Sequence, residues 1–313
     1  MISTLDLAKS YRGVDALRGV TLHVEEGAVL ALLGHNGAGK TTLVNILSTL
    51  LPPSGGTATV AGHDVVREGR QVRERIGLTG QFTSVDEKLS GRENLVLIGR
   101  LLGASRRQAR GRADDLLDAF GLTAAADRPC RTYSGGMRRR LDLALSLVGR
   151  PRVLFLDEPS TGLDPASRIA LWERVESLVA DGTTVLLTTQ YLEEAERLAH
   201  QVVVLSEGTV VAAGTPAELK ARVGERRAHL SVTRRGDATE VAAALRRSGL
   251  SAVETAQEGT VSVPVAEFTD FVQVVHAVED AEVPVVGLSL SEPSLDDVYL
   301  SLATGSSTVP TPR

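Results

Sequence analysis

The sequence predicts an α/β domain with a mainly parallel sheet, followed by a smaller α+β domain. Up to about residue 220, apolar segments typical of buried strands alternate with segments of helical period. One strand-like segment leads directly into a glycine-rich turn and a helix. Past Lys220 the order changes to short strands interrupted by two helices. These three observations determine the fold class that we expect.

The strands of the first domain are predicted from continuous apolar runs, because a strand in a parallel sheet is covered on both faces. The runs are 28–33, 153–156 and 184–187. A helix over 41–50 follows the first run. Between the other two, apolar residues recur at helical spacing and predict a helix with a core face, in which Trp172 needs no functional role. These residues are Ile169, Trp172, Val175, Leu178 and Val179.

Residues 88 to about 150 are expected to form a helical subdomain inserted into the α/β domain. The helical segments 95–102 and 113–120 have no strand between them, and a further helix follows Ser134. The arginines of this region could form a contact patch, but a solvated helix face is the interpretation that we favour. They are Arg106, Arg107, Arg110 and Arg112.

The second domain, over 221–304, shows the order β-α-β-β-α-β of a ferredoxin-like arrangement. Its strands are predicted at 230–233, 251–255, 261–265 and 283–290, and its helices at 238–247, 267–278 and from Leu295 onward. It contains no catalytic constellation, so we expect it to regulate activity or to support a dimer. The first domain accordingly spans 1–220, and 305–313, rich in Ser, Thr and Pro, is expected to be a disordered tail.

The composition narrows the possible functions. The 313 residues carry a formal net charge of −5, which gives no global attraction to nucleic acid, and only 3% of them are aromatic. Cys130 is the single cysteine, which excludes an internal disulfide and a cysteine-built zinc site. No apolar run approaches the roughly 20 residues needed to cross a bilayer, and the first residues lack a signal-peptide pattern. If the chain works at a membrane, we expect another chain to supply the membrane-spanning part.

Residues 34–41 carry the phosphate-binding pattern G-x-x-x-x-G-K-[ST] between a buried strand and a helix. Glycines let successive backbone amides point at phosphate oxygens, and the helix N-terminus adds a partial positive charge. Lys40 would add a full charge, Thr41 would offer its hydroxyl to Mg²⁺, and Thr42 would reach a phosphate. The alternative, a chance glycine turn, does not account for the flanking strand and helix. The candidate nucleotide-binding residues here are Gly34, His35, Asn36, Gly37, Ala38, Gly39, Lys40, Thr41 and Thr42.

Two carboxylates follow the strand 153–156. Asp157 suits a hard cation bound to phosphates. Glu158 would lie near the terminal phosphate, where it could orient and deprotonate a water molecule. Such a pair alone is often only a capped strand end, but the phosphate loop earlier in the chain favours the catalytic interpretation.

A second candidate phosphate site precedes the helix after residue 134. Ser134 is a good N-cap residue, and this is the simplest interpretation. Ser134-Gly135-Gly136 also offers a hydroxyl and free backbone amides at a helix N-terminus, which is the composition of an anion site.

In their order and spacing, five motifs resemble the ATP-binding-cassette (ABC) family. They are the phosphate loop, Gln81, Ser134-Gly135-Gly136, Asp157-Glu158 and the segment 160–164. The resemblance covers about residues 1–220 and implies an ATPase that uses ATP and Mg²⁺. It also implies that Ser134-Gly135-Gly136 of one cassette closes on the ATP held by Lys40 of another. Since the chain has one phosphate loop and one such signature, a complete site needs a second cassette, and we expect a homodimer.

The resemblance assigns roles to further residues. Tyr11 would stack on adenine, although an ordinary edge-strand tyrosine is the alternative. Gln81 would contact Mg²⁺ or the attacking water and sense the membrane partner, and Thr41 and Asp157 would be the other magnesium ligands. Asp164 would lie in a loop at the dimer interface.

Two positions depart from the general ABC pattern. The signature runs from Tyr133 to Met137, where a Leu and a Gln are more common, and Gln190 stands where a switch histidine is usual. Glutamine can hydrogen-bond the γ-phosphate or position water, but it cannot carry a proton as an imidazole does. With Met137-Arg138-Arg139-Arg140-Leu141-Asp142 and the segment 295–300, these departures resemble the daunorubicin-resistance-type exporter ATPases over nearly the whole chain.

That resemblance implies the ATP-hydrolysing subunit of an exporter, with Glu158, Gln190 and Gln81 as its catalytic residues. The chain would be peripheral at the cytoplasmic face of the cell membrane and would act through a separate integral-membrane permease on a drug-like or hydrophobic compound. We expect no nucleic-acid partner. Two alternatives stay open: a soluble ABC ATPase without a transport role, and an ATP-regulated binding module whose hydrolysis is impaired by Gln190.

Overall fold

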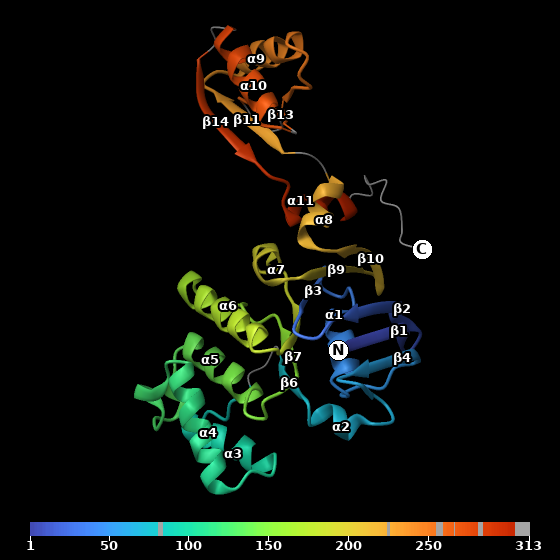
Figure 1. Ribbon diagram of the computed structural model, residues 1–313, viewed down its shortest axis with the longest axis vertical. Coiled ribbons are helices and arrows are strands. Elements are labelled where there is room, and N and C mark those ends of the chain that lie inside the picture. Colours follow the sequence, from blue (N-terminus) through green and yellow to red (C-terminus); the bar gives the residue numbers. More distant parts are fainter. Residues whose placement is uncertain (81–83, 224–225, 255–258, 266, 281–283, 304–313) are drawn as a thin grey trace. The chain divides into compact units, whose positions relative to one another are not determined.

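The computed structural model describes residues 1–80, 84–223, 226–254, 259–265, 267–280 and 284–303 (Figure 1). The chain divides into two compact units, Met1–Pro216 and Ala217–Pro312. Within the described ranges, no helix has the length and apolar character needed to cross a lipid bilayer. Every candidate site residue belongs to the first unit.

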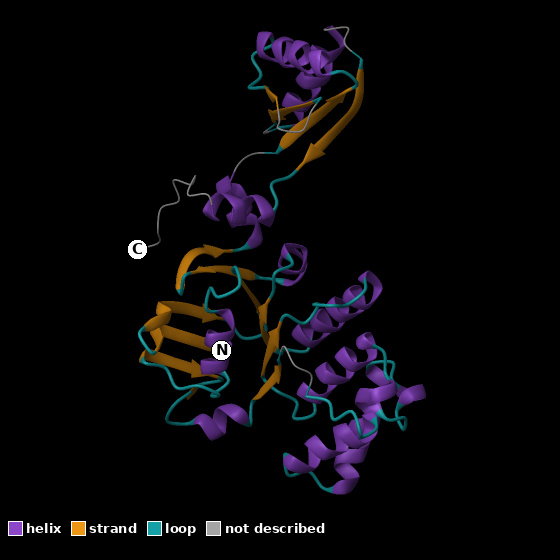
Figure 2. Ribbon diagram, turned by 180° about the vertical axis from the view of Figure 1, so that it is seen from behind, coloured by secondary structure: helices purple, strands orange, loops and turns teal. Residues whose placement is uncertain are grey.

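A six-stranded sheet forms the centre of the first unit (Figure 2). In spatial order its strands are β10 (Thr209–Gly214), β9 (Gln201–Ser206), β3 (Val29–Leu33), β8 (Thr184–Thr188), β7 (Val153–Asp157) and β6 (Ile76–Thr79). All neighbours pair in parallel except β10, which runs antiparallel to β9 at one edge. Every residue of β3, β7 and β8 is buried, as the three apolar runs predict. The mainly parallel α/β architecture is therefore confirmed.

A second, antiparallel sheet, which is not among the strands predicted above, covers the phosphate-loop side of the first unit. Its strands in spatial order are β2 (Val14–Val24), β1 (Ile2–Tyr11), β4 (Gly55–Val60) and β5 (His63–Asp64). Helix α1 (Lys40–Leu47) lies between the two sheets and contacts β2, β4 and β7 (Figures 1 and 2). Leu7, Leu43 and Phe155 belong to one buried cluster that joins these layers. The short helix α2 (Gly69–Arg73) then leads to β6.

Helices gather on the opposite side of the parallel sheet (Figure 1). They are α3 (Gly91–Leu101), α4 (Arg106–Ala119), α5 (Gly135–Ser146), α6 (Pro165–Ala180) and α7 (Leu192–Leu198), with short 3₁₀ turns at Thr123–Ala125 and Cys130–Thr132. The first three form the predicted helical insertion between β6 and β7. Trp172 is buried in the core cluster on this side, as predicted. Ile169, which belongs to the same periodic stripe, is instead 46% exposed.

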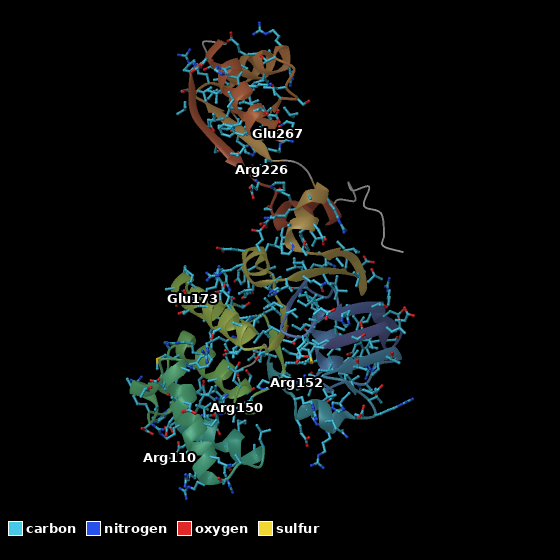
Figure 3. The ribbon with its side chains drawn as sticks, viewed as in Figure 1. Arg110, Arg150, Arg152, Glu173, Arg226 and Glu267 are labelled. Atoms are coloured by element: carbon cyan, nitrogen blue, oxygen red, sulfur yellow. The ribbon has the colours of Figure 1, made fainter. Side chains whose placement is uncertain are left out.

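The arginines of the helical insertion follow the solvated-face interpretation, with one exception. Arg106, Arg107 and Arg110 are exposed on α4, and Arg110 projects from the helical region (Figure 3). Arg112 is half-buried, and its guanidinium donates to the carbonyl oxygen of Leu147 at 2.7 Å.

The second unit has a four-stranded antiparallel sheet of spatial order β12-β13-β11-β14. Its elements are α8 (Pro216–Val223), β11 (Arg227–Val232), α9 (Arg235–Arg247), β12 (Val253–Glu254), β13 (Thr260–Pro264), α10 (Phe268–Asp280), β14 (Val285–Ser291) and α11 (Leu295–Ala303). This chain order and strand order confirm the ferredoxin-like arrangement. The predicted boundary at residue 220 lies within α8, and the predicted tail 305–313 lies outside the described residues.

Candidate functional site

The phosphate loop is a tight backbone turn that connects β3 to α1. Gly34, Gly37 and Gly39 have φ angles of 155°, 87° and 106°. A Cβ atom added to Gly39 would lie 2.6 Å from the carbonyl oxygen of Ala16, and one added to Gly34 would lie 2.5 Å from that of Leu205. Because φ and space both exclude a side chain at Gly39, the loop can take this shape only with glycine there.

Lys40 is the first residue of α1 and folds back over the loop. Its Nζ atom donates to the carbonyl oxygens of Gly34 at 2.6 Å and His35 at 3.2 Å, and the residue is only 6% exposed. Burial lowers the pKa of Lys40, while the negative charges of Glu158 and Asp157 oppose this effect. A buried ammonium group beside exposed loop amides suits a polyanion. The loop therefore fits the phosphates of a nucleotide.

A pocket of about 340 Å³ lies against the loop. It brings together four parts of the chain that are distant in sequence: strand β2, the phosphate loop with the start of α1, the residue after β7, and the segment after β8. Its lining consists of Ala16, Asn36, Gly37, Gly39, Lys40, Thr41, Thr42, Glu158 and Gln190. Three of the predicted site regions thus meet at one place.

Asp157, the last residue of β7, is buried next to the pocket. Its Oδ1 atom accepts a short hydrogen bond from the Thr188 hydroxyl, and its Oδ2 atom lies 3.4 Å from the Thr41 hydroxyl. Among the described residues, no group of three or more His, Cys, Asp or Glu side chains could hold a metal ion. Magnesium commonly binds proteins through one or two carboxylates together with substrate phosphates, and Asp157 and Thr41 fit that mode.

Glu158 follows Asp157 with a φ of 49°, an uncommon conformation for a non-glycine residue. Its backbone amide donates to the carbonyl oxygen of Thr188 at 3.0 Å. Its Oε1 atom accepts from Gln190 Nε2 at 2.6 Å. Gln190 Nε2 also donates to Asn36 Oδ1 at 3.2 Å and so connects the phosphate loop to this carboxylate.

The signature and dimer-loop residues lie on other helices and do not line the pocket of their own chain. Ser134 caps α5, where its hydroxyl oxygen accepts from the Met137 amide at 3.2 Å. Asp164 caps α6 and accepts from the backbone and side chain of Ser167, and these hydrogen bonds lower the pKa of Asp164. Both capping side chains bond within the first turn of their own helix, so their predicted roles in a dimer stay predictions.

Four further predicted residues either do not line the pocket or fall outside the residues that the structure describes. Tyr11 ends β1 at 41% exposure, with Lys9 Nζ 5.2 Å from its ring centroid. His35 is exposed, and Ala38 is buried beneath the loop. Gln81 lies outside the described residues.

Sequence reasoning missed a buried carboxylate behind the site. Glu194 of α7 is fully buried, and its Oε1 atom accepts from the Ser160 hydroxyl and from Trp172 Nε1 at 3.0 Å. Burial raises the pKa of Glu194. Helix α7 carries three glutamates, Glu193, Glu194 and Glu196, so the sequence gives no signal that distinguishes Glu194, and its partners are brought together only by the fold.

Both units are similar in sequence to known proteins. Residues 17–161 match the family model of ABC transporters, and 214–303 match the C-terminal domain of DrrA1-3-like ATP-binding proteins. The chain is 51% identical over 298 residues to the daunorubicin resistance ATP-binding protein DrrA2 of Streptomyces coeruleorubidus, covering 95% of this chain and 92% of that protein. It is 47% identical over 305 residues to the daunorubicin/doxorubicin resistance ATP-binding protein DrrA of Streptomyces peucetius, covering 96% and 92%.

The similarity to solved structures concerns the first unit's fold. An ATP-binding subunit of an ABC transporter has a TM-score of 0.65 and 29% identity, over 71% of this chain and 92% of that chain. A dimeric ATP-binding cassette in a post-hydrolysis state, bound to ADP and Pi, has a TM-score of 0.63 and 24% identity, over 69% and 98%. The second of these shows a common fold alone.

Proposed function

The chain belongs to the ATP-binding proteins of ABC transporters, of the daunorubicin-resistance type, and from this premise we propose that it is the ATPase subunit of a drug exporter. It couples ATP binding and hydrolysis to the export of a drug-like or hydrophobic compound. Similarity to proteins named for daunorubicin and doxorubicin resistance supports this class of compound. A separate integral-membrane permease carries the compound, and the chain is bound to it at the cytoplasmic face of the membrane. No nucleic acid takes part.

The pocket beside the phosphate loop is the observation that carries the proposal. There a buried lysine, a strained glutamate and a glutamine converge on one space, and the Asp157 carboxylate lies beside the Thr41 hydroxyl of its lining. Phosphoryl transfer needs a cradle for the phosphates, oxygen ligands for a cation and a group that orients water. The described residues supply each of these parts.

Each residue of the site has a separate task in hydrolysis. Magnesium, when bound with ATP, neutralises charge that develops on the phosphates. Lys40 and the loop amides hold the phosphates, and Thr41, Asp157 and Gln81 provide magnesium ligands. Glu158 accepts a proton from the attacking water at a carboxylate oxygen, while Gln190 holds the other oxygen through its 2.6 Å hydrogen bond.

The complete site forms between two copies of this chain. Ser134-Gly135-Gly136 offers a hydroxyl and helix N-terminal amides but does not line the pocket of its own chain. In the homodimer that we propose, these residues close on ATP bound by the partner, with Tyr11 stacked on the adenine ring and Asp164 at the interface.

ATPase activity of three purified proteins tests the function. Wild-type chain should hydrolyse ATP with Mg²⁺. Glu158→Gln should bind ATP, lose about 10²–10⁴-fold in turnover because the base is removed, and accumulate as an ATP-bound dimer in size-exclusion chromatography. Lys40→Ala should lose both ATP binding and turnover. Glu173→Gln, a change of the same type at an exposed position of α6, is the matched control.

Two results would contradict the proposal at different levels. Undiminished turnover in Glu158→Gln would remove this residue from the role of base. Absence of ATP hydrolysis by the wild-type chain, both alone and together with the integral-membrane protein recovered with it, would refute the ATPase assignment as a whole. Recovery of an integral-membrane protein with the wild-type chain from detergent extracts tests the permease partner separately.

A further inference from the structure

Arg139 of the signature helix α5 reaches the catalytic end of β7. Its guanidinium has five N–H donors. Nε donates to the carbonyl oxygen of Pro159 at 2.8 Å, and Nη2 donates to those of Asp157 at 3.2 Å and Glu158 at 3.0 Å. Nη1 donates to the carbonyl oxygen of Gly80 at 3.1 Å and to Asp142 Oδ2 at 3.3 Å. The number of acceptors therefore equals the number of donors.

Asp142 completes this arrangement one helical turn after Arg139. Its second oxygen, Oδ1, accepts from the backbone amide of Ser84 at 2.8 Å. The Asp142 side chain is 1% exposed and the Arg139 side chain 11%, so both charges are removed from water. Burial raises the pKa of Asp142 and lowers that of Arg139, although their mutual attraction opposes both effects.

The pair joins three segments that belong to different parts of the proposed mechanism. It lies on the helix that Ser134 caps, it holds three consecutive carbonyl groups around Glu158, and it contacts Gly80 and Ser84 after β6. Glu158 is one of seven non-glycine residues with a positive φ among the described residues, and such a conformation persists only where its surroundings fix it. Arg139 donates hydrogen bonds to four backbone carbonyl oxygens, three of them at residues 157–159, and these bonds restrict the backbone around Glu158.

We propose that Arg139 and Asp142 are positioning residues for ATP hydrolysis. They hold the backbone at 157–159 so that the Glu158 carboxylate keeps its catalytic position, and they transmit displacements of the signature helix to that position. This inference rests on the proposed function, because it assigns Glu158 the role of base. Neither residue lines the pocket, so neither contacts the nucleotide directly.

The chemistry of the two side chains gives sharp test variants. Lysine keeps the charge of Arg139 but has only three donors on a flexible stem, so Arg139→Lys cannot satisfy all five acceptors. Both partners of Asp142 are donors. Asp142→Asn keeps the shape but leaves an NH₂ group facing one of them, because asparagine has a single acceptor oxygen. Arg140→Gln is the control, since neighbouring Arg140 donates at 3.0 Å to the carbonyl oxygen of Phe120, away from the pocket.

Steady-state ATPase kinetics and ATP affinity of these variants test the inference. Arg139→Lys and Asp142→Asn should each lower kcat by about tenfold to a hundredfold, because a small misplacement of a catalytic group has effects of this size. The KM for ATP, and its Kd by calorimetry, should stay within about threefold of the wild-type values, because the phosphate loop is unchanged. Arg140→Gln should keep wild-type kcat.

Hydrogen exchange provides a second readout that does not depend on turnover. Peptides covering 84–90 and 153–162 should exchange faster in Arg139→Lys than in wild type, and in Arg140→Gln they should not. If circular dichroism shows that one of the two variants is unfolded, the kinetics and the hydrogen exchange of the other variant test the positioning role.

The outcomes separate the inference from the proposed function. If wild type hydrolyses ATP and Glu158→Gln does not, but Arg139→Lys and Asp142→Asn keep wild-type kcat, the positioning role is wrong and the proposed function stands. Parallel losses of kcat and ATP affinity in Arg139→Lys and Asp142→Asn would show a purely structural role and would also overturn the positioning role. If Glu158→Gln keeps wild-type turnover, the proposed base role fails, and the positioning role fails with it.

Discussion

Replacement of Gln190 by alanine tests how the site holds its catalytic carboxylate without an imidazole. In the structure, Gln190 Nε2 lies 2.6 Å from Glu158 Oε1 and 3.2 Å from Asn36 Oδ1. Alanine removes both hydrogen bonds, and among the described residues the Glu158 side chain then keeps the hydroxyl of Thr161, at 3.4 Å, as its hydrogen-bond donor. The carboxylate should then sample positions that do not face the attacking water.

The size of the effect follows from the charged acceptor and the exposure of the site. A hydrogen bond to a charged group contributes about 1.5–3 kcal/mol, and the exposed position of Gln190 favours the lower end. About 1.4 kcal/mol corresponds to a factor of ten in rate. We therefore expect kcat to fall by about tenfold in Gln190→Ala, while the KM for ATP changes little because Lys40 and the loop amides remain.

The assay is steady-state ATP hydrolysis over a range of pH in wild type, Gln190→Ala and Gln190→His. Glutamine does not titrate, so wild type and Gln190→Ala should have profiles of the same shape. Gln190→His should add an imidazole, which titrates at a pH of about 6.5. Any contribution of His35 is common to all three proteins and cancels in the comparison.

Two results would refute this reasoning. An unchanged kcat in Gln190→Ala would show that the contact with Glu158 has no role in turnover. A change of kcat at a pH of about 6.5 that is present in wild type and lost in Gln190→Ala would show that position 190 acts through a proton.

Three further predictions concern the loop and the core. Gly39→Ala should weaken ATP binding in calorimetry by about tenfold or more, because the added methyl group would lie 2.6 Å from the Ala16 carbonyl oxygen. Gly37→Ala should weaken binding less, since no atom lies within 4 Å of a Cβ added there. Equal losses of affinity in the two variants would contradict the steric argument. Burial raises the pKa of Glu194 above its unfolded value, so wild-type stability should fall as pH rises through the interval between the two values. Relative to wild type, Glu194→Gln should therefore gain unfolding free energy in urea from acidic to mildly alkaline pH, and a gain that shrinks instead would refute this. Phe155→Ala, at a fully buried position of β7, should cost about 3–5 kcal/mol in the urea transition of the first unit, and a loss below about 1 kcal/mol would mean that the cavity collapses.

The sequence predicts the central strands well because burial on both faces leaves a continuous apolar run, as in β3, β7 and β8. The antiparallel sheet gives no such signal. In β1 the buried residues are Ile2, Thr4 and Leu7, so their spacing changes from two residues to three, and the pairing of β1 with β2 is interrupted by register shifts. The period-two pattern is therefore broken. Ile169 is exposed although it fits the helical stripe. Periodicity predicts which face of a helix a residue lies on, but it does not predict whether another element covers that face at each position.

The candidate site is predictable where one short segment contains it and unpredictable where the sheet assembles it. The phosphate loop is local, and its pattern specifies the residues. The meeting of Glu158 with Gln190 depends on β7 and β8 being parallel neighbours, with Asp157 paired to Thr188 in register. Arg139 and Asp142 show the spacing of two residues on one helix face, but their backbone partners lie at the end of β7 and in the segments that follow β6 and β7, and they have no sequence signature.

Trp172 gives the molecule a built-in optical probe. It is the one tryptophan in the sequence, it is 3% exposed, and its indole N–H bonds to Glu194 at 3.0 Å while Arg197 lies 5.3 Å from its ring. Ser160 shares the same carboxylate and begins the segment that ends at Asp164. When tryptophan is excited selectively over the four tyrosines, emission from unlabelled protein therefore has a single source, placed behind the loop that joins β7 to α6. Changes in that loop can then be followed in real time without an attached dye.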